Sequence, residues 1–179
     1  MILENISEAK EKDLQKGTFL ILLNATKIPP HILLAHNGFY YSLSVKGVDK
    51  HQDLKILFAH INKKKSKTIF IQLNTSASNT LIEAELEKSF SSYKSLNLGN
   101  STCLAPIKDF CAAVFALNIS GVDFVFQLIA ELKHQKKIGF ITHFHLENEL
   151  VNSTFALPVY SFKEINEEIE RAGNSMIDK

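Results

Sequence analysis

Residues 128–142 carry the most informative signal in the sequence: Leu128-Ile129-Ala130-Glu131-Leu132-Lys133-His134-Gln135-Lys136-Lys137-Ile138-Gly139-Phe140-Ile141-Thr142. The first part of this segment places apolar residues at helical spacing, and its last part is a short apolar run typical of a strand. The chain therefore passes from a helix into a strand with almost no loop between them.

The same kind of pattern predicts an ordered series of elements before and after this segment. Upstream, Pro106 suits the first turn of a helix, and Cys111 falls on the apolar stripe of that helix, where it is expected to be a small buried core residue. A turn over 118–121 leads to a helix over 122–134. Downstream, we expect a strand over 138–146, a tip over 147–153 and a return strand over 154–159. Capping-box pairs predict two further helices, which begin at Thr80 and at Ser161.

Three helices followed by a two-stranded hairpin resemble the winged-helix family over residues 79–160. In that family the helix after the turn enters the DNA major groove. The resemblance implies a contact surface on the helix 122–134 together with the tip, formed by Asp123, Gln127, Glu131, Glu147 and Asn148. Acidic side chains there would repel phosphates, so this surface favours a protein partner over sequence-specific DNA.

The first half of the chain is predicted to form a small α/β unit. Its clearest signal is Asn37-Gly38 between two apolar runs, which predicts a hairpin with a type I′ turn. Buried strands are expected near 19–23 and 69–73, a peripheral helix over 4–16, and a helix whose capping box begins at Asp49. We therefore expect an α+β protein of two units, 1–75 and 76–179, joined at the polar stretch 74–78.

Composition limits the classes of function. With 45% hydrophobic and 22% charged residues among 179, the chain should fold around a core. The net charge is +1, and Arg171 is the only arginine, whereas base-edge reading of DNA relies on bidentate arginine. The sequence shows neither a signal peptide nor an apolar run near the ~20 residues that span a bilayer. We expect a cytoplasmic protein without a membrane, metal or other cofactor partner.

Two residues are candidates for chemistry. Cys103 precedes a predicted helix, where the helix dipole favours a reactive thiolate, and His31 lies on the predicted hairpin with polar neighbours. With Lys16-Gly17-Thr18-Phe19 upstream, this order is similar to circularly permuted papain-like amidases, although Thr102 stands where that family has asparagine. The resemblance implies a thiol hydrolase with Cys103 as nucleophile and His31 as base. The alternative, which we favour from the sequence, is a non-enzymatic interaction or regulatory module.

His143, His145 and Glu147 alternate along one predicted strand and would share a face. A metal site needs three or four ligands with supporting partners. We interpret these histidines as surface residues of the strand and not as ligands.

Overall fold

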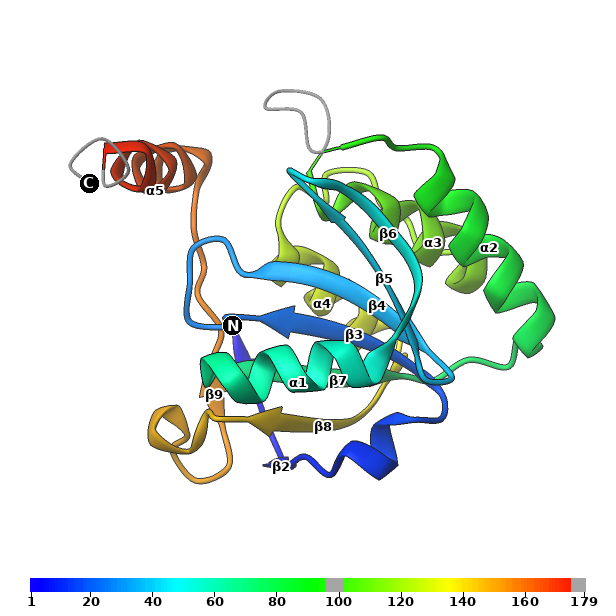
Figure 1. The fold of residues 1–179 in the computed structure, drawn as a ribbon, viewed down its shortest axis with the longest axis horizontal. Coiled ribbons are helices and arrows are strands. Elements are labelled where there is room, and N and C mark those ends of the chain that lie inside the picture. Colours follow the sequence, from blue (N-terminus) through cyan, green and yellow to red (C-terminus); the bar gives the residue numbers. More distant parts are fainter. Residues whose placement is uncertain (96–101, 175–179) are drawn as a thin grey trace.

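The computed structural model describes residues 1–95 and 102–174 as a mixed α+β fold built around one large sheet (Figure 1). The strands are β1 (Ile2–Leu3), β2 (Ile6–Glu8), β3 (Thr18–Leu23), β4 (His31–His36), β5 (Phe39–Ser44), β6 (Gly47–Asp53), β7 (Thr68–Leu73), β8 (Ile138–Phe144) and β9 (Phe155–Ala156). The helices are η1 (Glu11–Leu14), α1 (Leu54–Lys64), α2 (Asn79–Ser91), α3 (Ala105–Phe115), α4 (Val125–His134), η2 (Glu147–Glu149) and α5 (Phe162–Asn174).

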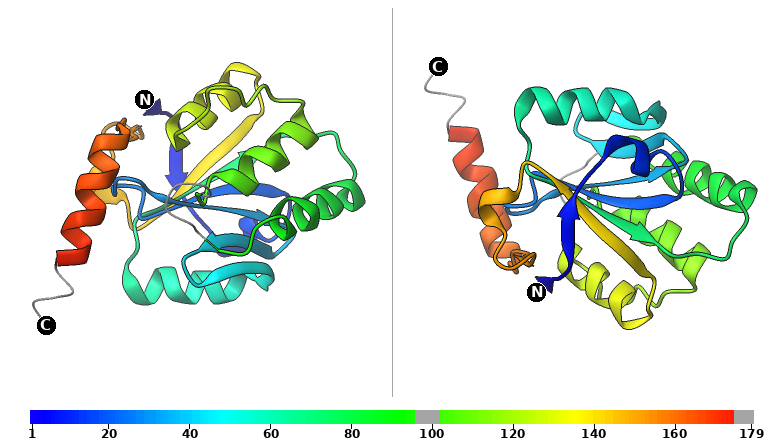
Figure 2. Two further views of the ribbon diagram at one scale, coloured as in Figure 1. Left: turned by 90° about the horizontal axis from the view of Figure 1, so that it is seen from above. Right: turned by 90° about the horizontal axis from the view of Figure 1, so that it is seen from below.

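The large sheet has the order β2-β8-β7-β3-β4-β5-β6 and is antiparallel except for the β2–β8 pair. Helix α1 covers one face, and α2, α3 and α4 lie on the other (Figure 2). Strand β8 comes from the second half of the chain but lies between β7 and β2 from the first half. The two units predicted from the sequence therefore share one sheet.

The expected winged hairpin is not formed. The strand expected over 138–146 is present as β8, but it pairs with β7 and β2, and the return segment pairs as β9 with β1. The tip is the short helix η2 followed by a bridge between Val151 and Thr154. The three helices are present as α2, α3 and α4, so the order of elements is correct while the winged-helix assignment is not confirmed.

The hairpin at Asn37-Gly38 is confirmed. Both turn residues have positive φ, 47° and 84°, as a type I′ turn requires. The register pairs His36 with Phe39 and Leu34 with Tyr41, as the turn predicts. One face of the hairpin meets the core: Ile32, Leu34 and Tyr41 are buried in the cluster between the sheet and α2–α4, and Leu43 on the same face is also buried.

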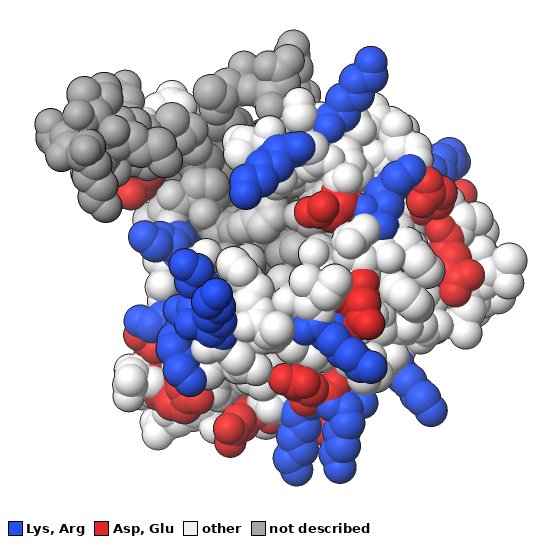
Figure 3. Space-filling view, in the orientation of Figure 1, with Lys and Arg blue, Asp and Glu red and all other residues white. Residues whose placement is uncertain are grey.

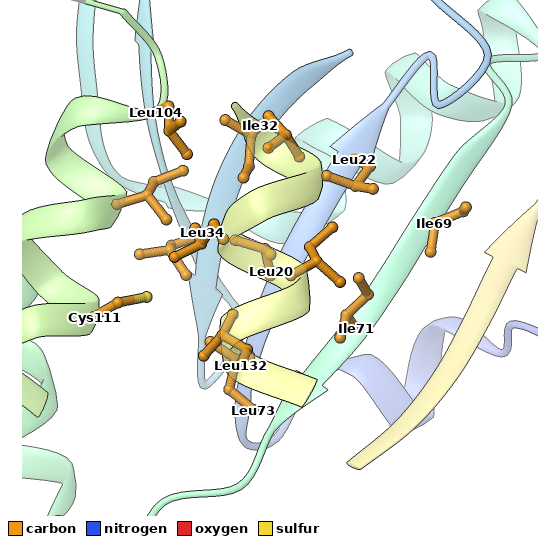
Figure 4. Close-up of a cluster of buried hydrophobic side chains, with 14 of the residues drawn as sticks. Leu20, Leu22, Ile32, Leu34, Ile69, Ile71, Leu73, Leu104, Cys111 and Leu132 are labelled. Carbon is orange, nitrogen blue, oxygen red and sulfur yellow. The ribbon is translucent and has the colours of Figure 1, made fainter. Parts of the chain in front are cut away.

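Two apolar clusters hold the layers together. The larger fills the space between the sheet and α2–α4, and Figure 4 shows Leu20, Leu34, Ile71 and Leu132 meeting in it. Cys111 is fully buried there, as the sequence predicts. The smaller cluster lies under α1, where the rings of Phe58, Phe70 and Phe144 contact one another at centroid distances of 5.6–6.1 Å.

Two local predictions are wrong. The segment 4–16 forms strand β2 and the short helix η1 instead of a peripheral helix. The segment beginning at Asp49 continues strand β6, and α1 begins only at Leu54, where the Asp53 side chain accepts a hydrogen bond from the Lys55 N–H at 2.8 Å. In both places pairing with a neighbouring strand outweighs the local helix signal.

Strand β6 ends the sheet on one side. Its pairing with β5 shifts between Tyr40 and Ser42, and His51 has a φ of 51° and stacks on Phe39. Lys50 on this strand bonds to Glu87 of α2. A bulge, a lysine and a neighbouring helix all discourage further strand pairing at an edge.

Helix α5 stands apart from the sheet at the C-terminal end of the described chain (Figure 1). Its capping box is confirmed, because the Glu164 carboxylate accepts from the Ser161 N–H at 2.8 Å and the Glu164 N–H donates back to the Ser161 hydroxyl at 3.4 Å. Within the described ranges, every helix is too short or too polar to cross a membrane.

The aromatic contact under α1 gives a test of the fold. Replacing Phe58 with alanine should lower the free energy of unfolding by about 3–5 kcal/mol, because it leaves a cavity beside Phe70 and Phe144. Ile56→Ala in the same helix is the matched control, since that side chain is 58% exposed and should change stability by less than about 0.5 kcal/mol. Urea denaturation measures both, and equal effects would show that α1 is not packed as described.

Candidate functional site

Four aromatic side chains meet where α4 begins and the chain leads into α5; we call Phe124, Phe126, Tyr160 and Phe162 the aromatic surface. Phe124 and Phe126 stack at 5.3 Å between ring centroids, with an interplanar angle of 8°. Tyr160 meets both edge-on at 5.5 and 5.3 Å, and Phe162 lies 4.7 Å from Phe124. Such edge and offset contacts are the favoured geometries for aromatic rings.

Backbone anchors hold this surface in place while leaving its outer part open. Leu157 is buried, and its N–H donates to the Met1 carbonyl at 2.9 Å. Tyr160 is also buried, so the connecting segment is fixed at two points. Val159, which lies between these anchors, is nevertheless 59% exposed, and Phe162, which follows them, is 61% exposed. Large apolar side chains are thus held in contact with solvent at a fixed position.

The contact residues predicted from the sequence have mixed surroundings. Asp123 is exposed and adjoins Phe124 in the chain. Gln127 is engaged in capping α4, because its Oε1 accepts from the Asp123 N–H at 2.7 Å and the Phe124 N–H at 3.0 Å. Glu131 accepts a hydrogen bond from Gln135 at 2.8 Å. Glu147 and Asn148 are exposed on η2, beyond the end of β8.

Acidic groups border the aromatic surface. Asp123 lies on one side, and the first turns of α5 contribute Glu164, Glu167 and Glu168, with Lys163 as the basic residue among them. Lys163 pairs with Glu167 at 3.9 Å. The hydrogen bonds from Ser161 hold the pKa of the exposed Glu164 carboxyl below its usual range. Lys108 adds a positive charge beside Asp123, because its ammonium group donates to the Val122 carbonyl. Carboxylates still outnumber ammonium groups, so the border carries a net negative charge at neutral pH.

Cys103 lies just before α3 and packs against the larger apolar cluster. Backbone N–H groups of Ile32, Cys103 and Leu104 lie around its sulfur and favour the thiolate, but burial has the larger effect and raises the pKa of the thiol. The direction is opposite to the one expected from the helix dipole alone. Burial, helped by the nearby thiol, also raises the pKa of Tyr160 to about 12.

His31 lies on the other face of the sheet. Its neighbours Leu33 and Ala35, which share its side of β4, pack under α1, whereas Cys103 packs on the α2–α4 side. The His31 Nε2 is 3.0 Å from the Ser42 hydroxyl, and Asp49 acts on the ring electrostatically. In this arrangement the sheet separates the histidine from the thiol.

A second polar cluster, which the sequence did not reveal, surrounds His36 at the other end of β4. The Gly17 N–H donates to Asn37 Oδ1 at 3.0 Å, which directs the Asn37 amide nitrogen to His36 Nε2 at 2.9 Å. Nε2 is then the acceptor, so the proton resides on Nδ1, which donates to the Thr18 hydroxyl at 2.9 Å. In this tautomer the protonated Nδ1 cannot act as a base toward Thr18.

In comparisons with known proteins, no family model, no curated protein and no solved structure matches this chain.

Three histidines predict how stability depends on pH: His36 and His143 are buried, and His31 is partly buried. The burial of His143 contradicts the prediction that it is a surface residue of its strand. Burial lowers the pKa of His31, His36 and His143 below the ordinary 6.5, so the unfolded chain binds more protons than the folded one. Their stabilising effect is complete above about pH 6.5 and should be lost as the pH falls below it, with a slope of at most about 1.4 kcal/mol per pH unit for each histidine. Urea denaturation between about pH 7.5 and 5, a range above that in which carboxyl groups ordinarily titrate, measures this loss of stability.

Two variants test whether these histidines cause the pH dependence of stability. His36→Gln should reduce it, because one shifted group is removed, whereas His60→Gln at an exposed helical position should not. A stability that is constant over this range, or that rises on acidification, contradicts the assignment.

Proposed function

We propose that the protein is a non-enzymatic interaction module that binds an apolar segment of another protein on the aromatic surface. The observation that carries the proposal is Phe162, which is 61% exposed while its ring lies 4.7 Å from Phe124. An aromatic side chain held rigidly in water has little conformational freedom left to lose when a partner covers it.

The residue types support this choice. Aromatic residues are enriched in the centres of protein interfaces, where they supply much of the binding free energy. Phe124 and Phe126 are half-buried, and Phe162 contacts the ring of Phe124. The two stacked rings would form the floor of such a contact. The stacked floor is already assembled, so binding would require little rearrangement.

The charged groups around the aromatic surface determine which kind of partner it would favour. Asp123 and Glu164 would attract lysine or arginine side chains, so the expected partner is an apolar segment flanked by basic residues. The same carboxylates would repel nucleic-acid phosphates, and DNA is accordingly disfavoured as a partner.

Selection from a displayed peptide library tests the proposal. Peptides enriched on the wild-type protein should carry aromatic or aliphatic anchors next to lysine or arginine. Phe162→Asp should weaken their binding at least tenfold, since burying a new charge against Phe124 costs more than about 1.4 kcal/mol. Fluorescence anisotropy with a selected peptide measures the affinity.

Two further variants complete this test. Asp123→Lys should weaken binding more at low than at high salt, because screening removes repulsion between exposed charges. Ile56→Asp on α1 introduces the same charge at another exposed apolar position and should leave binding unchanged. If selected peptides bind Phe162→Asp as well as the wild type, the aromatic surface is not the contact site.

The second candidate is a thiol hydrolase with Cys103 as nucleophile. It is favoured by the three backbone N–H groups around the Cys103 sulfur, which would stabilise negative charge on that atom. It would also need a base on the same side of the sheet, and His31 bonds instead to Ser42. For this reason we rank it below the interaction module.

Alkylation of the folded protein at several pH values, followed by peptide mass spectrometry, separates the two candidates. Because burial raises the pKa of Cys103, its reaction should be slow, with a midpoint above the free-thiol value of about 8.5. Cys111, whose pKa burial raises to about 12, is the internal control. A midpoint for Cys103 well below 8.5 (about one unit or more) would favour the hydrolase, which Cys103→Ala should then inactivate.

A further inference from the structure

A cavity of about 380 Å³ opens on the α1 face of the sheet, beside β2 and η1 and away from the aromatic surface. This volume is within the range of small-molecule sites, roughly 300–1,000 Å³. Leu14 and Phe140 form its apolar wall. Phe140 is 42% exposed and is held by an edge contact with Phe19 at 5.8 Å.

Three charged groups border this cavity: Glu8, Lys10 and Asp13. All three are exposed, and none forms an ion pair with another residue in the described part of the chain. Figure 3 shows side chains of both signs gathered along the lower edge of the molecule, where β2 and η1 lie. The cavity therefore offers two carboxylates and one ammonium group to a ligand.

A buried hydroxyl is left without a partner in the same cavity. Thr142 is 8% exposed and lines the cavity beside Ser7, with which it pairs across the β2–β8 ladder. Within residues 1–95 and 102–174 its Oγ1 finds no hydrogen-bond partner. Buried polar atoms are nearly always hydrogen-bonded, so an unpaired one calls for an explanation.

We propose that this cavity binds a free α-amino acid with an apolar side chain. Glu8 and Asp13 would receive the ammonium group, Lys10 the carboxylate, and Leu14 and Phe140 the side chain. Thr142 would gain the hydrogen bond that it lacks. Lys10 lines the same cavity as both carboxylates, which argues for a zwitterion over a metal cation, because a lysine ammonium repels a cation. This site is independent of the proposed protein contact.

Calorimetric titration of the full chain with L-phenylalanine and L-leucine tests the proposal. Saturable binding is expected for both. N-acetyl-L-phenylalanine, which lacks the ammonium charge, and L-phenylalaninamide, which lacks the carboxylate, should each bind at least tenfold more weakly, since hydrogen bonds to charged groups contribute about 1.5–3 kcal/mol. No heat of binding for either amino acid, or equal binding of the N-acetyl compound, overturns the proposal.

Variants identify the residues. Asp13→Asn combined with Glu8→Gln should weaken L-phenylalanine binding at least tenfold, whereas Glu11→Gln, in the same short helix but outside the cavity lining, should not. Thr142→Val should weaken binding while leaving Tm unchanged or higher, because it removes an unpaired buried hydroxyl at nearly constant shape. Unchanged affinity in the double variant or in Thr142→Val places the ligand elsewhere and overturns the assignment.

Discussion

The pairing of β8 with β7 is the constraint on which the rest of the structure depends. It brings the second half of the chain into the sheet started by the first, and β2 then adds in parallel on the outer side of β8. Because α4 leads into β8 through a tight turn, the same pairing sets α4 against the sheet, where Leu128 and Leu132 complete the larger cluster. Gly139 permits the close approach, since a Cβ there would lie 2.4 Å from Gln72 Oε1 and 2.8 Å from Asn74 Oδ1.

Local signals predicted the elements but not their partners. The Asn37-Gly38 turn fixes two neighbouring strands through a backbone geometry that the sequence names directly. Nothing local tells whether the strand over 138–144 folds back on the following segment or joins β7, because both pairings bury the same alternate residues. The helix expected over 4–16 failed for a related reason: Ile6 and Ser7 gain a ladder with β8 that periodicity cannot foresee.

In the candidate sites, too, local signals predicted single residues but not their tertiary contacts. Asp123 was predicted as a contact residue because it lies on the solvent-exposed side of the predicted helix 122–134, and the structure places it next to Phe124 of the aromatic surface. Phe124 and Phe126 were missed as a pair because their spacing of two is not a helical stripe, and Phe162 because its neighbours come from another part of the chain. The position of Cys103 before α3 was predictable, whereas its burial and the sheet between it and His31 are tertiary facts.

The two faces of the sheet keep the two proposed sites apart. Phe140 and Thr142 face the α1 side, where Phe140 contacts Phe19 of the smaller cluster, while the aromatic surface lies at the start of α4 on the opposite side. Substitutions at sites without shared partners usually have additive effects. Coupling between the sites would require an amino acid to bind two arrangements of the β8–α4 unit with different affinity. The short turn between α4 and β8 and the fully buried Leu128 and Leu132 oppose such a second arrangement, so the two sites are expected to act independently.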